Sequence, residues 1–164
     1  MPVVSDASPL ILFAKIGRLD LLKKLYSEVL IPREVEKEVT RREASPLISG
    51  IREGWIKVED VELSSEVKEM GEKLGLHEGE MYALSLALHK NIKEFLADDK
   101  LARVAARIIG IKPIGCLGVV MKVYETSIIT KSEAVNTIQK LVEVGLWISP
   151  EVLGEVLTSM EVDK

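Results

Sequence analysis

The sequence predicts an α/β fold built on a parallel sheet. Short apolar segments alternate with amphipathic helical patterns, which indicates strands joined by right-handed helical crossovers. One apolar segment, residues 95–97, ends abruptly in Asp98 and Asp99, and a helical pattern begins directly after this acid pair. Open α/β sheets bind their ligands at such strand ends. The same stretch therefore indicates where a functional site is to be expected.

Five strands and the helices between them are expected from the order of these segments. The strands are expected at residues 2–5, 29–31, 55–61, 95–97 and 112–116. Ser8 and Pro9 are expected as the N-cap and first residue of one helix, and Thr130 begins a capping box. The other helices are expected at residues 19–26, 32–39, 45–54, 65–74, from 80 onward, 101–109, 117–126 and 150–160. In the helix from 130, the inward residues are expected to be Val135, Ile138, Leu141 and Val142.

The size and composition of the chain predict one domain, residues 1–164. Cys116 is the only cysteine, so an internal disulfide is impossible and a reducing, cytoplasmic setting is expected. The first residues lack the basic and apolar regions of a signal peptide, and no apolar run approaches the roughly 20 residues of a membrane span. The 29% of charged residues and the scarcity of amide side chains resemble thermophile composition.

The formal net charge of −4 bears on the class of partner. Proteins that coat or bend DNA need many Lys and Arg side chains to neutralise phosphates, so the charge argues against that class. It does not argue against an enzyme that contacts nucleic acid through metal ions.

Carboxylates are expected to meet at one edge of the sheet. Asp6 follows the first strand, and Asp98 and Asp99 follow the fourth. Glu80 begins the helix that leads into the fourth strand, and Glu38 lies about 9 Å along a helix that starts at the same edge. These acids converge if the first and fourth strands are neighbours. Taken singly, each also fits a plainer role as a turn residue, a solvated helix residue or a charge compensating a helix dipole.

A divalent cation is the expected ligand of such a cluster, because carboxylates without matching cations repel one another in a dry cleft. All-oxygen ligands favour Mg²⁺ or Mn²⁺ over zinc, and such a site can activate water for attack on a phosphodiester. Arg103, one helical turn after the acid pair, is expected to hold a phosphate, whereas Arg107 is expected to be ordinary surface charge. His77 lies alone in a polar loop and is expected to be a surface or loop-packing residue.

The ordered set of motifs resembles the PIN-domain family of nucleases, and within that family the small prokaryotic toxin-like (VapC-like) branch. The matching segments are residues 4–10, 31–39, 76–87, 96–103 and 114–118, and they span about residues 3–120. The resemblance implies a three-layer, Rossmann-like sheet in strand order 3-2-1-4-5 with helices on both faces. It divides the chain into a catalytic α/β part, residues 1–120, and a C-terminal helical extension, residues 121–164.

The resemblance also implies an activity and a set of site residues. The activity is Mg²⁺- or Mn²⁺-dependent cleavage of RNA. The implied catalytic acids are Asp6, Glu38, Glu80 and Asp99. The implied metal ligands are Asp6, Glu80, Asp98 and Asp99. Ser8 is implied to support the reacting water. Tyr82 stands where relatives often carry a second acid, which leaves one or two metal ions open. A homodimer is expected on the same ground, and an antitoxin protein would be the partner if the chain is a toxin.

Two other functions stay open. A catalytically silent PIN-like domain could keep the acids and act as a protein- or RNA-binding module. A phospho-acceptor receiver domain also places acids at strand ends, but its chemistry needs a Lys after the fifth strand. The chain has Gly115 and Cys116 there, so the receiver function is disfavoured.

Overall fold

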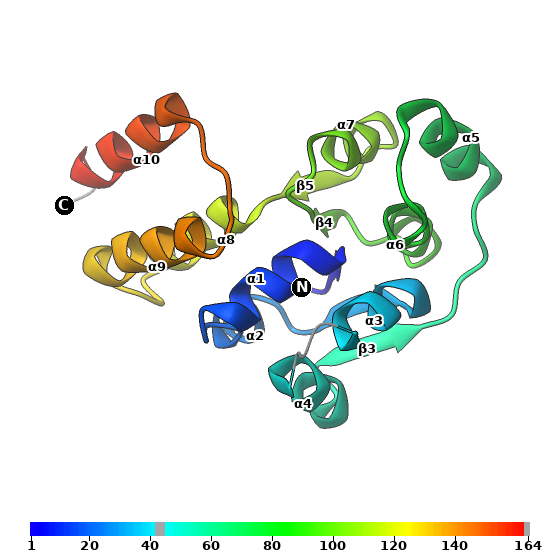
Figure 1. Ribbon diagram of the computed structural model, residues 1–164, viewed down its shortest axis with the longest axis horizontal. Coiled ribbons are helices and arrows are strands. Elements are labelled where there is room, and N and C mark those ends of the chain that lie inside the picture. The colour runs from blue at the N-terminus through cyan, green and yellow to red at the C-terminus, as the bar shows by residue number, and fades with distance from the viewer. Residues whose placement is uncertain (42–44, 163–164) are drawn as a thin grey trace.

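The computed structural model describes residues 1–41 and 45–162, and it shows a five-stranded sheet surrounded by helices (Figure 1). The strands are β1 (Val3–Ser5), β2 (Val29–Pro32), β3 (Ile56–Glu59), β4 (Glu94–Leu96) and β5 (Lys112–Ile114). Every pairing is parallel, and the strand order is β3-β2-β1-β4-β5. The predicted α/β fold and its strand order are therefore confirmed.

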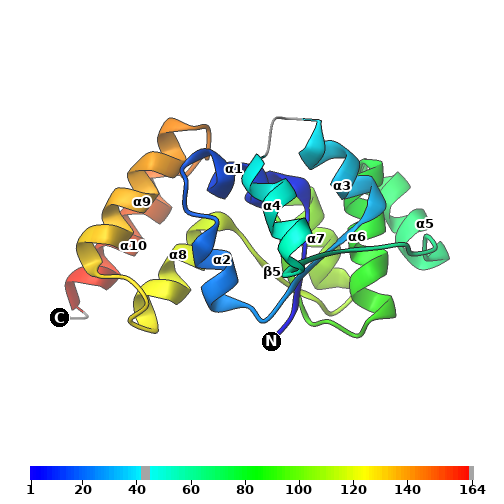
Figure 2. The ribbon, with the colours of Figure 1, turned by 90° about the horizontal axis from the view of Figure 1, so that it is seen from below.

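Ten helices lie within the described part of the chain. They are α1 (Ala7–Lys15), α2 (Asp20–Leu25), α3 (Arg33–Thr40), α4 (Ser45–Glu53), α5 (Ser65–Leu74), α6 (Glu78–His89), α7 (Lys100–Ile108), α8 (Cys116–Glu125), α9 (Lys131–Glu143) and α10 (Pro150–Val162). Helix α6 packs against β1, β2 and α3. Helices α9 and α10 lie at the opposite end of the molecule from α5 (Figures 1 and 2).

The sheet centre is an apolar core. Val3 and Val4 of β1 and Phe95 and Leu96 of β4 have no exposed surface. Parallel strands that are covered on both faces contain continuous apolar runs rather than alternating patterns. This coverage explains why these short segments could be identified as strands, and it gives the sheet edge a rigid support.

The carboxyl ends of β1 and β4 lie side by side. Ser5 pairs with Leu96 in the sheet register, and the N–H of Asp6 donates a hydrogen bond to the Leu96 carbonyl oxygen at 2.9 Å. The chain runs from β1 to β2 on one side of β1, whereas β4 lies on the other side. The strand order therefore reverses here, and such a reversal is where open α/β sheets form a ligand crevice.

The start of α1 differs from the prediction. The helix begins at Ala7 rather than at Pro9, and Asp6, not Ser8, is its N-cap residue with extended backbone angles (φ −77°, ψ 171°). The early start buries Ala7 and Leu10 completely. Pro9 is tolerated there because the N–H groups of a first helical turn have no intrahelical partner.

Smaller differences concern other boundaries and one helix face. Helix α6 begins at Glu78 rather than Glu80, and β3 and β5 are shorter than expected. In α9, Val142 is 46% exposed and does not face the core, whereas Ile138 and Leu141 are buried. Adjacent helical residues are turned by about 100° from each other, so Leu141 and Val142 cannot both point inward at the edge of the buried stripe. Within the described residues, no helix is both long and apolar enough to cross a membrane.

Candidate metal centre

One cavity at the carboxyl edge of the sheet is lined by the site residues that were predicted from the sequence. Its lining includes Asp6, Ser8, Glu38, Glu80, Asp98, Asp99 and Arg103, together with His77. They come from the ends of β1 and β4, the starts of α1, α6 and α7, and the last turn of α3. The convergence follows from the neighbouring positions of β1 and β4.

Asp6 is the most deeply placed of these acids. Its residue is only 3% exposed, and its Oδ1 atom is buried without a hydrogen-bond partner. Burial raises the pKa of the Asp6 carboxyl to about 6, and repulsion from the charges of Glu38 and Asp99 also raises it. The Ala7 N–H and His77 lower this pKa. A buried carboxylate oxygen without a donor is costly unless a cation or a proton compensates it.

Glu80 faces Asp6 from the first turn of α6. It is also 3% exposed, and its Oε1 accepts a hydrogen bond from the backbone N–H of His77 at 3.1 Å. Burial raises the pKa of Glu80 to about 7, and the charge of Asp6 adds to the increase. Two carboxyl groups therefore share a site in which both cannot ionise at low cost.

His77 joins this pair, although the sequence predicted a surface residue. Its side chain is 55% exposed, as expected, but one ring nitrogen and one carboxylate oxygen each from Asp6 and Glu80 lie within 4.8 Å of one another. His77 is the N-cap residue of α6 and Glu80 is three residues later. Side chains at these two positions meet at a helix start. The three-residue spacing of His77 and Glu80 in the sequence was therefore a signal that could have placed His77 beside Glu80.

Glu38 reaches the same place from α3. A Cβ atom built on Gly79 would lie 3.5 Å from Oε1 of Glu38 and 3.4 Å from Cε1 of His77, so both side chains lie against Gly79. The Glu38 charge also contributes to the raised pKa of Asp6. Glu38 thus borders the Asp6 carboxylate from the side of α3.

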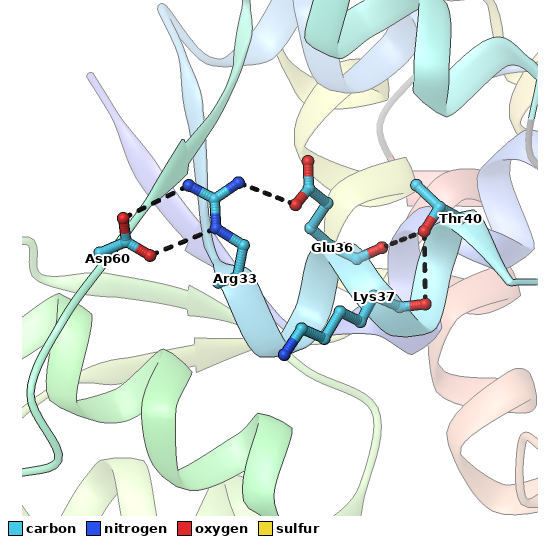
Figure 3. Close-up of polar contacts among 5 residues, drawn as sticks. All are labelled: Arg33, Glu36, Lys37, Thr40 and Asp60. Atoms are coloured by element: carbon cyan, nitrogen blue, oxygen red, sulfur yellow. Dashed lines mark hydrogen bonds and ion pairs between the residues drawn. The ribbon is translucent and has the colours of Figure 1, made fainter.

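One ion pair joins the helix that carries Glu38 to the residue after β3, and further polar contacts lie within that helix (Figure 3). Arg33 donates a hydrogen bond to Oδ1 of Asp60, the residue that follows β3, at 3.2 Å. It donates another to Oε1 of Glu36 at 3.0 Å. The hydrogen bond from Arg33 lowers the pKa of Asp60. At the other end of α3, the Thr40 hydroxyl donates to the Glu36 carbonyl oxygen at 2.8 Å. Of these contacts, only the exposed Arg33–Asp60 ion pair connects the start of α3 with the end of β3.

Asp98 and Asp99, the two acids that follow β4, make different contacts. Asp99 is the N-cap of α7, and its Oδ2 accepts a hydrogen bond from the Ala102 N–H at 2.9 Å. The charge of Asp99 also raises the pKa of Asp6 and the pKa of Glu80. Asp98 accepts from Cys116, through the backbone N–H at 2.8 Å and the thiol at 3.0 Å. Burial raises the pKa of that thiol, which keeps it protonated as a donor. Asp98 is therefore oriented by α8.

Cations line the cavity beside the acids. Lys100, Arg103, Arg107 and Lys112 all contribute to the lining, and none forms an ion pair or a side-chain hydrogen bond with the residues that the structure describes. Arg107 was expected to be ordinary surface charge, and its side chain is exposed, but it belongs to this cavity wall. Unpaired cations next to an acidic cluster can bind phosphate groups.

The donor set fits a divalent cation. One Asp6 carboxylate oxygen lies with a Glu80 oxygen and a His77 nitrogen in a group compact enough to surround one ion, and the Oδ1 atom of the same Asp6 carboxylate has no hydrogen-bond partner. A bound cation would lower both raised pKa values and remove the repulsion between the acids. Carboxylate oxygens are the ligands that Mg²⁺ and Mn²⁺ prefer, whereas an imidazole nitrogen is a common ligand of zinc and iron, so this donor set fits a divalent cation without selecting one ion.

Comparison with known families gives a match over nearly the whole chain. A family model described as a PIN domain matches residues 2–162. No curated protein matches the chain. PIN domains are generally nucleases and typically use divalent metal ions, in agreement with the acidic cluster at the sheet edge. The chain belongs to the PIN-domain family.

Proposed function

We propose that the protein is a metal-dependent endoribonuclease that hydrolyses phosphodiester bonds of single-stranded RNA. The observation that carries the proposal is the buried Asp6 carboxylate, whose Oδ1 lacks a donor and which lies beside the Glu80 carboxylate. Such an arrangement is unfavourable in the free protein and becomes favourable when a cation binds. A bound Mg²⁺ or Mn²⁺ would supply Lewis-acid chemistry and a water of lowered pKa.

The chain's own residues have distinct roles in this proposal. Asp6, Glu80 and the His77 ring nitrogen, which lie in one compact group, would hold the ion. Asp99 and Asp98 are further metal ligands in this proposal and lie outside that group, and Glu38 borders Asp6 as the fourth catalytic acid. Ser8, on the first turn of α1, supports the reacting water by hydrogen bonding. Arg103 holds the phosphate of the substrate, since its guanidinium group has no partner among the described side chains.

One metal ion is the simplest count for this chain. The compact group of Asp6, His77 and Glu80 surrounds a single position, and Tyr82 offers no carboxylate where relatives often carry a second acid. Asp98 has both oxygens engaged by Cys116, although each oxygen keeps lone pairs for a further contact.

A place in a toxin–antitoxin pair is the biological setting that we propose. Its support is the resemblance of the ordered motifs to the toxin-like (VapC-like) branch. The protein would then work as a homodimer and bind an antitoxin protein. A small neighbouring reading frame with a DNA-binding pattern, whose product co-purifies with this chain, would support the pairing.

The alternative is a catalytically silent PIN domain that binds RNA or protein. It predicts RNA binding, or partner binding, that does not depend on a metal ion and is not followed by cleavage. Metal dependence separates the two functions directly.

The test is cleavage of a labelled single-stranded RNA with Mn²⁺, with Mg²⁺ and with EDTA. We expect cleavage with either metal and none with EDTA, and we expect Asp6→Asn and Glu80→Gln to reduce the rate at least about 100-fold. Glu72→Gln is the matched control, because Glu72 is an exposed acid of α5 outside the cavity lining. Equal cleavage by the wild-type chain and Asp6→Asn would reject the proposed site.

A further inference from the structure

The cavity of the metal centre extends beyond the acids to an exposed tryptophan. Its lining continues along α7 and β5 to the segment between α9 and α10, and it includes Trp147. Trp147 is 80% exposed, more than any other large apolar side chain in the described part of the chain. An indole this exposed leaves most of its apolar surface in water, where it is free to pack against a ligand that enters the cavity.

The segment that carries Trp147 is held firmly in place. Leu146 is buried, and its N–H donates to the Leu141 carbonyl oxygen at 2.9 Å. On the other side, Ile148 packs against the core, and the Ser149 hydroxyl accepts from the Val152 N–H at 3.2 Å as α10 begins. Trp147 is therefore exposed between two anchored neighbours, and its position needs little ordering when a ligand binds.

The cavity wall that includes Trp147 and the acids also includes four cations. Lys100, Arg103, Arg107 and Lys112 lie in the same lining without ion pairs to described residues. Lys122 also lines the cavity, but it is paired with Glu94 at 3.1 Å and is not available. In a chain of net charge −4, unpaired cations gathered on one wall are complementary to a polyanion.

We propose that this wall is a subsite for single-stranded RNA, in which Trp147 stacks on an unpaired base and the four cations contact neighbouring phosphates. The inference rests on the proposed function and adds a position beside the scissile phosphate. A base can stack on an indole only when its face is free, so the subsite selects single strands over duplexes. Because every base has a π-face, the contact adds affinity with little sequence preference.

The experiment measures binding of a fluorescein-labelled oligouridylate to the full chain in EDTA, where cleavage does not interfere. Base stacking on an aromatic side chain corresponds to about 1–3 kcal/mol, so Trp147→Ala should weaken binding about 5- to 150-fold. Trp147→Phe should retain most of the affinity. Ile108→Ala is the matched control, because Ile108 is 63% exposed on α7 but lies outside the cavity lining, and it should bind like the wild type.

A second probe separates stacking from charge. An abasic strand of the same length keeps the phosphates and lacks the bases, so the wild-type chain and Trp147→Ala should bind it equally. Arg107→Ala and Lys112→Ala should weaken both probes, and each should reduce the slope of log K against log salt by about 0.7.

Several results would overturn the subsite. These are absence of oligouridylate binding, unchanged binding by Trp147→Ala, or an equal loss on the abasic strand. Altered sedimentation of Trp147→Ala with unchanged RNA binding would instead assign Trp147 to a contact between two copies of the chain. Failure of the proposed function is distinguishable: RNA would still bind through Trp147, but Mn²⁺ would produce no cleavage.

Discussion

The Glu80 carboxylate contacts both the backbone and the ring of His77. Its Oε1 accepts a hydrogen bond from the His77 backbone N–H at 3.1 Å and lies 3.5 Å from Nε2 of the His77 ring. The backbone contact belongs to the start of α6 and survives any substitution except Pro. The ring contact is the part that a substitution can remove, and it places a nitrogen ligand beside two carboxylates.

We therefore expect His77→Ala to change metal preference more than fold stability. An imidazole nitrogen binds Mn²⁺ more readily than Mg²⁺, so affinity for Mn²⁺ should fall about tenfold or more while affinity for Mg²⁺ changes less. Titration calorimetry with each metal measures this. His89→Ala replaces the other histidine of the chain, which is exposed at the far end of α6, and should change neither affinity. An equal loss for both metals would contradict the role of the ring nitrogen.

The raised pKa of Asp6 predicts how stability depends on pH in the metal-free protein. Between the unfolded value of 3.8 and the folded value of about 6, the folded state binds more protons than the unfolded state. The free energy of unfolding should therefore fall as pH rises from about 4 to 7, by up to about 3 kcal/mol for Asp6 alone. Glu80, with a pKa raised to about 7, contributes in the same direction.

Urea unfolding in EDTA at pH 5 and pH 7.5 measures this dependence. Asp6→Asn cannot ionise at this position, so its stability should vary less with pH than that of the wild-type chain. A wild-type chain that becomes more stable as pH rises over this interval would contradict the burial of an ionisable acid cluster.

Metal binding should reverse the destabilisation at neutral pH. An ion that binds only the folded state stabilises it by about 2.7 kcal/mol at 100 times its dissociation constant. We expect Mn²⁺ to raise the melting temperature at pH 7.5 and to raise it less at pH 5, because protons compete for Asp6 and Glu80. Asp6→Asn should melt higher than the wild type in EDTA and respond little to Mn²⁺. The same increase in both chains would place the metal elsewhere.

Gly115 supports the arrangement of Asp98 and Arg103. A Cβ atom at Gly115 would lie 2.8 Å from Oδ1 of Asp98 and 3.1 Å from Nη1 of Arg103. Gly115→Ala should therefore displace both side chains, lower the free energy of unfolding by about 1–3 kcal/mol and reduce RNA cleavage. Gly154→Ala is the control, because a Cβ at Gly154 in α10 meets no atom within 4 Å, and it should be neutral or stabilising. Wild-type activity in Gly115→Ala would show that this close packing is dispensable.

The sequence was most informative where burial is complete. The apolar runs of β1 and β4 read as strands because both faces are covered, and their polar ends marked the sheet edge. Asp6, Glu80 and Asp99 could be placed there because their positions follow from strand ends and helix starts. Their convergence in one cavity is a property of the strand order, whereas their roles in catalysis stay predictions.

Side-chain detail at helix ends was less accessible to sequence reasoning. Ser8 was expected to cap α1, but burial of Ala7 and Leu10 moved the helix start to follow Asp6 directly. His77 was hidden in a glycine-rich loop because the start of α6 was expected at Glu80. Trp147 gave no signal, since only the folded chain shows that α9 and α10 bring it to the cavity wall.

The most direct test of the metal centre is anomalous diffraction from crystals of the protein soaked in Mn²⁺. We expect an anomalous peak within bonding distance of Asp6 and Glu80, beside His77, and no such peak in crystals of Asp6→Asn. Well-ordered wild-type carboxylates without an anomalous peak among them, at a Mn²⁺ concentration that supports RNA cleavage, would contradict this expectation.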